Sequence, residues 1–175
     1  MSLRNLKILG VIIAFILCFP LHFLYDKIPC FLTSIVAPVN ESIMEHMKIL
    51  FGSILLSGVI QKIIVKLKDL PFKNICISNV CVSFLSIPIF LILYLPIYYS
   101  FGEYLPLTIL LMLITIIISQ LISVIIIKKT DLHMENVAII LVIIIYVIFG
   151  ILTYNPPKTD VFLDPISLKY GINEK

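Results

Sequence analysis

The chain has 175 residues, of which 61% are hydrophobic and 13% are charged, and its net charge is +3. An ordinary globular domain carries about 25% charged residues, so the composition argues against a typical soluble domain. No basic run is long enough to indicate nucleic-acid binding. Several apolar runs reach the roughly 20 residues that cross a bilayer. The sequence therefore predicts an all-α integral membrane protein whose partners are membrane lipids and not nucleic acids.

Five apolar segments predict a bundle of five transmembrane helices in one domain, residues 1–154. The predicted spans cover residues 8–25, 40–64, 75–99, 105–127 and 136–154. Pro156 and Pro157 stop the last helix, because proline cannot continue it. Residues 155–175 are therefore predicted to form a tail outside the bilayer that packs on the outer rim.

The lysines and arginines predict the orientation of the bundle. With the N-terminus inside, the inner segments carry eight of them and the outer segments carry five. The positive-inside rule then places the N-terminus on the inner side of the cell membrane and the C-terminus on the outer side. This orientation gathers polar groups from distant parts of the chain on the outer face. These groups are His22, Asp26, Glu41, Glu45, His46, Glu103, Asp160 and Asp164.

The most polar stretch, residues 38–48, reads PVNESIMEHMK and opens a long apolar segment. Ionisable groups at such a depth need partners or a function. Part of the stretch has a structural explanation, since Asn40 is a good N-cap for a helix. Ser42 and Glu45 also fit a capping box, in which a hydroxyl and a carboxylate satisfy free backbone amides.

A helix that begins at Asn40 would place Glu41, Glu45 and Lys48 on one stripe, with His46 on the adjacent stripe. Two carboxylates one turn apart disfavour double ionisation unless a cation or a proton lies between them. A metal site or an acid/base pair uses that arrangement. An interfacial salt-bridge network also accounts for it, and both interpretations stay open.

Two further acidic residues are candidates for the same outer site. Asp26 follows His22 by four residues at the end of the first span, where a carboxylate can fix the tautomer of an imidazole. A hydrogen-bonded helix end is the alternative. Asp164 precedes Pro165, a pair typical of turns. A tail that folds back over the rim would also let Asp164 act as an acidic ligand.

Three motifs, at residues 21–25 (LHFLY), 38–48 and 162–171, carry a family resemblance. The third motif consists of Phe-Leu-Asp-Pro and a later Tyr-Gly. With them the chain resembles, along its whole length, a family of small, uncharacterised multipass proteins found mainly in Gram-positive bacteria. The family pattern often has Trp where this chain has Met44. The resemblance implies a multipass membrane protein and no particular activity.

A looser similarity connects the chain to seven-span membrane hydrolases of the alkaline ceramidase and adiponectin-receptor type. Those enzymes also place Glu, Ser, His and Asp at helix ends around zinc. This chain has fewer predicted spans and lacks an HxxxH pair, so the similarity is an analogy of site chemistry.

An enzyme is the first functional hypothesis. It would bind a divalent metal such as zinc and activate water, or use acid/base chemistry on a lipid or lipid-linked substrate. The candidate catalytic residues are Glu41, Glu45, His46 and His22. The candidate metal ligands are His22, His46, Glu45, Asp26 and Asp164.

Two other hypotheses use the same residues. A binding or transport module would recognise a cation or a small solute from outside, and five spans without an internal repeat are few for a lone transporter. A structural subunit would use the polar rim only to fix helix packing. The sequence determines neither the substrate nor the oligomeric state.

Overall fold

The computed structural model describes residues 1–172, which form seven α-helices and one short 3-10 helix, η1. Five of the helices are long and apolar enough to cross a membrane. These are α1 (Leu3–His22), α4 (Ile43–Leu67), α5 (Ile75–Phe101), α6 (Leu105–Ile127) and α7 (Glu135–Tyr154). The prediction of an all-helical chain with five long apolar helices is confirmed.

The first two long helices begin and end at other residues than the predicted spans. α1 begins earlier than expected, at Leu3, because the Ser2 hydroxyl caps it by accepting a hydrogen bond from Asn5 N at 3.2 Å. It ends at His22, and the short helix α2 (Leu24–Lys27) follows Phe23. The expected loop contains another short helix, α3 (Phe31–Val36), and α4 then begins at Ile43 instead of residue 40.

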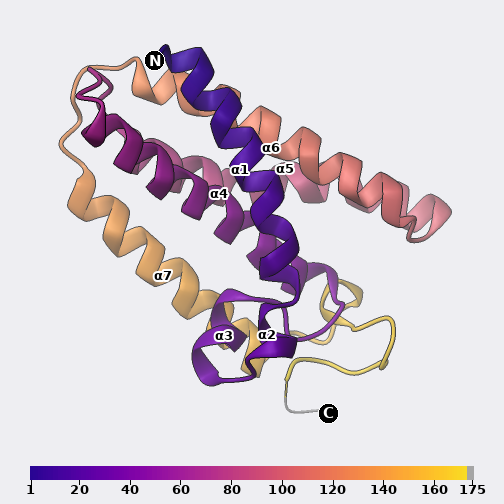
Figure 1. The fold of residues 1–175 in the computed structure, drawn as a ribbon. Helices are drawn as coiled ribbons and strands as arrows, with labels where there is room; N and C mark the ends of the chain where they lie inside the picture. The colour runs from indigo at the N-terminus through magenta and orange to yellow at the C-terminus, as the bar shows by residue number, and fades with distance from the viewer. Residues whose placement is uncertain (173–175) are drawn as a thin grey trace.

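Helix α4 lies at the centre of the bundle, between α1 and α5, and α6 packs against α1 and α5 (Figure 1). Close contact between α4 and α5 depends on Gly58, because a Cβ there would lie 1.8 Å from Asn79 Cγ. The Asn79 amide instead donates to Leu55 O at 2.9 Å. Small residues that admit a polar side chain are typical of helix contacts in membranes.

The two ends of the bundle differ in what covers them (Figure 1). Helices α2 and α3 and the tail, with η1 (Asp160–Phe162), gather where α1 ends. The tail is fastened there because Ile172 N donates to Thr153 O of α7 at 3.1 Å. Within the tail, Leu163 forms a bridge with Tyr170. The N-terminus and the end of α6 lie at the opposite end.

Candidate functional site

The turn before α4 decides which side chains can meet. Asn40 is not the N-cap: its Oδ1 accepts a hydrogen bond from Ser42 N at 3.0 Å, and Ser42 caps the helix by accepting from Glu45 N at 3.4 Å. Only the hydroxyl half of the expected capping box forms, since the Glu45 carboxylate accepts from Val39 N instead. Glu41 therefore lies outside the helix, away from the stripe predicted for it.

Glu45 and Lys48 form a buried ion pair with an N–O distance of 2.6 Å, and their side chains are 7% and 1% exposed. Lys48 Nζ also donates to Ser34 O at 2.7 Å and to Ala37 O at 3.4 Å. The hydroxyl of Thr153, on α7, accepts from Lys48 and donates to Glu45 Oε1. We call these five residues the ion-pair cluster. With Val39 N, which also donates to Glu45 Oε2, they satisfy the Glu45 carboxylate, and Glu45 does not belong to the group that contains His22.

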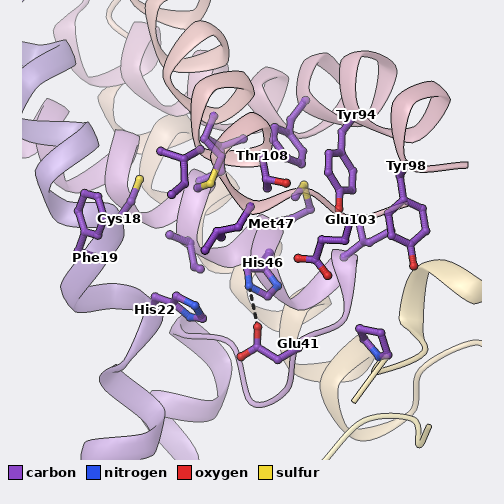
Figure 2. A pocket seen from close by; sticks show the side chains of 18 of the residues that line it. Cys18, Phe19, His22, Glu41, His46, Met47, Tyr94, Tyr98, Glu103 and Thr108 are labelled. Carbon is purple, nitrogen blue, oxygen red and sulfur yellow. Dashed lines mark ion pairs between the residues drawn. The ribbon is translucent and has the colours of Figure 1, made fainter. Parts of the chain in front are cut away.

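Three other predicted residues come together at the end of α1. His22, Glu41 and His46 each offer one ligand atom, and these atoms all lie within 4.8 Å of one another. Figure 2 shows the two imidazoles and the carboxylate around a common space. The ring centroids of His22 and His46 are 5.1 Å apart. We call this group the His–Glu–His group.

The hydrogen bonds of His46 fix the chemistry of its free nitrogen. Nδ1 lies 2.9 Å from Ser42 O, and a carbonyl only accepts, so Nδ1 carries a proton. Nε2 then faces Glu41 Oε2 at 3.3 Å. Two acceptors in contact require a cation between them, either a second proton on the ring or a metal ion.

The other two members of the group, Glu41 and His22, differ in their surroundings. The hydrogen bond with His46 is the largest effect that holds the pKa of Glu41 below its usual range, so this carboxylate is ionised at neutral pH. His22 Nδ1 is buried and has no hydrogen-bond partner, although buried polar atoms ordinarily have one. Two imidazoles and a carboxylate form a set that could hold a divalent metal.

A cavity of about 150 Å³ adjoins the group and lies between α1, α4, α5 and α6. Its walls are mainly apolar, and the His–Glu–His group forms part of its polar lining. Residues Leu163 and Pro165 bring the tail to the cavity. Four further polar side chains line it: Tyr94, Tyr98, Glu103 and Thr108.

Glu103 is a cavity residue that the sequence analysis placed on the outer face but not in the site. Its carboxylate points toward His46 in Figure 2, and it belongs to the turn between α5 and α6. A signal was present in the sequence, because Glu103 is the only carboxylate between Asp69 and Asp131. An isolated ionisable residue between long apolar runs marks a candidate functional position.

The remaining candidate ligands lie elsewhere. Asp26 is exposed on α2 and is not a member of the His–Glu–His group. Asp164 is buried, but its Oδ1 accepts from Ile166 N at 3.0 Å and its Oδ2 accepts from the Ser167 hydroxyl. These bonds close a turn in the tail, which is the structural role weighed for an Asp-Pro pair.

The ion-pair cluster generates a stability prediction. Lys48→Met leaves the Glu45 carboxylate buried without a cation and should lower the free energy of unfolding by about 3–5 kcal/mol. The double variant Glu45→Gln/Lys48→Met should lose less, because no uncompensated charge remains. Thermal and denaturant unfolding in detergent measure both effects, with the exposed Lys27→Met as the control. A Lys48→Met protein as stable as Lys27→Met would contradict the prediction.

Comparison with known proteins identifies a family but no activity. Neither a curated protein nor a solved structure matches the chain. A family of unknown function (DUF6512) matches residues 1–172. This match supports the resemblance to an uncharacterised family along the length of the chain. The chain belongs to the family of unknown function DUF6512.

Proposed function

We propose that this chain is a multipass protein of the cell membrane that hydrolyses an amphiphilic lipid or lipid-linked substrate with a divalent metal. The metal, zinc by ligand type, would be held by His22, Glu41 and His46. One observation carries the proposal: His22, Glu41 and His46 offer ligand atoms within 4.8 Å of one another beside an apolar cavity, and the buried Nδ1 of His22 has no hydrogen-bond partner.

The ligand types favour zinc in a catalytic setting. Zinc takes imidazole nitrogen and carboxylate oxygen, and catalytic sites use three protein ligands and leave a fourth position open. The bond from His46 Nδ1 to Ser42 O is the outer-shell contact that orients a ligating histidine. At the open position, zinc would lower the pKa of a water molecule to about 7 and so supply a hydrolytic nucleophile at neutral pH.

The cavity favours an amphiphilic substrate. A cavity of about 150 Å³ admits an apolar group of roughly the size of benzene. The part of a lipid chain next to its head group would fit there, with the reacting bond beside the His–Glu–His group. Glu103 would face that bond from the opposite side as a general acid or base.

A transport function is supported less well. Transport would need a path from the His–Glu–His group past Gln120 to the other end of the bundle. The cavity lining does not include Gln120, which borders a separate groove between α1 and α6. A purely structural role suits Glu45, whose hydrogen bonds go to Lys48, Thr153 and Val39, but it leaves the unpartnered nitrogen of His22 unexplained.

Zinc binding is the first test. The purified protein in neutral detergent should bind one zinc ion, and His22→Ala or His46→Ala should weaken binding by about 100-fold or more, since outer-shell partners alone contribute about 10–100-fold. His133→Ala is the matched control, because His133 is exposed and lies beside Asp131. Affinity should fall as the pH is lowered, because metal ligands bind in their deprotonated form and protons compete with the metal. Equal zinc content in wild type and His22→Ala would overturn the metal site.

Hydrolysis is the second test. The zinc-loaded protein should turn over at least one class among fluorogenic lipid esters, amides and phosphodiesters in mixed micelles. Glu103→Gln should lower kcat by about 10²–10⁴-fold, the usual contribution of acid/base catalysis, without changing the zinc content. Glu135→Gln, at an exposed position on α7, is the control. Wild-type activity in Glu103→Gln would remove Glu103 from the mechanism, and inactivity on every class would contradict hydrolysis.

Cysteine labelling tests the proposed orientation, in which the His–Glu–His group faces the outside. Cys30 is exposed, near the outer end of the bundle, and Cys76 is partly exposed at the start of α5. In intact cells, a membrane-impermeant maleimide should label a chain that retains only Cys30. A chain that retains only Cys76 should react only after permeabilisation. The reverse pattern would place the site on the cytoplasmic face.

A further inference from the structure

A second pocket lies at the other end of α1, where the chain begins. It is a groove of about 530 Å³ between α1 and α6. Its lining consists of basic, amide and apolar side chains and contains no carboxylate. The basic residues are Arg4, Lys7 and Lys128, and the apolar residues are Leu3, Ile8, Val11, Ile12, Ile117, Leu121 and Val124.

Lys7 is a buried ammonium without an acidic partner. It is 7% exposed, and its Nζ donates to the neutral Gln61 Oε1 at 2.7 Å. No ion pair joins it to a carboxylate among residues 1–172. A buried cation ordinarily needs a counter-charge, so Lys7 is incompletely satisfied within the described part of the chain.

Gln120 adds an unused donor to the same groove. Its Oε1 accepts from Gln61 Nε2 at 3.4 Å, whereas its own Nε2 is buried and has no partner. The positive-inside rule alone would account for the exposed Arg4 and Lys128. It does not account for a buried lysine and an unpartnered buried amide in one groove. These groups offer donors and positive charge, which is the chemistry that recognises an anion.

We propose that this groove binds an anionic phospholipid, with its phosphate near Lys7, Arg4 and Lys128. An acyl chain would lie against the apolar side chains of α1 and α6. Free phosphate would leave those apolar walls uncovered, whereas a lipid covers them and neutralises the cations together. Basic pockets between membrane helices on the cytoplasmic side bind anionic head groups in this way. Lys7 lies about 22 Å along α1 from His22, at 1.5 Å per residue, and the two pockets share no lining residue, so this site does not depend on the proposed hydrolysis.

Lipid binding to the purified full-length protein in neutral detergent tests the proposal. Native mass spectrometry and thermal unfolding should show one tightly bound phosphatidylglycerol and a higher Tm, with no such effect from phosphatidylcholine. Arg4→Gln/Lys128→Gln should weaken phosphatidylglycerol binding by about 30-fold, because each cation near the surface contributes roughly fivefold. Lys66→Gln/Lys68→Gln is the matched control. It removes the same charge at exposed positions outside the groove, at the C-terminal end of α4.

Three outcomes would overturn the proposal. Equal binding of phosphatidylcholine would remove the requirement for an anion. Equal weakening by the Lys66→Gln/Lys68→Gln control would indicate a diffuse electrostatic effect in place of a groove. Displacement of the lipid by millimolar inorganic phosphate would identify a free-anion site. Binding should persist in His22→Ala, so that failure of this site and failure of the zinc site are separate results.

Discussion

The buried ion pair between Glu45 and Lys48 is the interaction on which the site end of the molecule depends. Lys48 donates hydrogen bonds to a carbonyl of α3 and to a carbonyl of the segment that follows it. Glu45 accepts a hydrogen bond from the backbone amide of Val39. Thr153 connects the pair to α7. A buried pair is stable only when further hydrogen bonds satisfy both charges, and here they do. The cluster thus fixes the backbone that leads to Glu41 and frees that carboxylate for His46.

The long helices could be predicted because runs of about 20 apolar residues have few alternatives to a spanning helix. The short helices α2 and α3 could not, since four and six residues carry no periodic signal. The start of α4 was misplaced because Asn and Ser both cap well. The choice between them involves the tail, where the Asn40 amide donates to Gly171 O at 3.4 Å.

Part of the candidate site was also accessible from the sequence. Orientation alone brought His22, Glu41 and His46 to one face, and the structure brings their ligand atoms together. The environment of Glu45 was not accessible, because its partner Thr153 lies 108 residues away in the chain. Glu103 was passed over because a single carboxylate in a turn forms no spaced motif with another candidate residue. Its position in the cavity lining depends on how α5 and α6 pack.

Polar side chains of α4 and α6 meet α1 at Gly10. Ser57 donates to Gly10 O at 2.7 Å, and the amides of Gln61 and Gln120 meet beside it. A Cβ at residue 10 would lie 2.4 Å from Gln61 Nε2, so only glycine leaves room for this contact. The linings of the two pockets share no residue. The proposed metal site and the proposed lipid site therefore use different parts of α1 and share no side chain, so loss of one does not entail loss of the other.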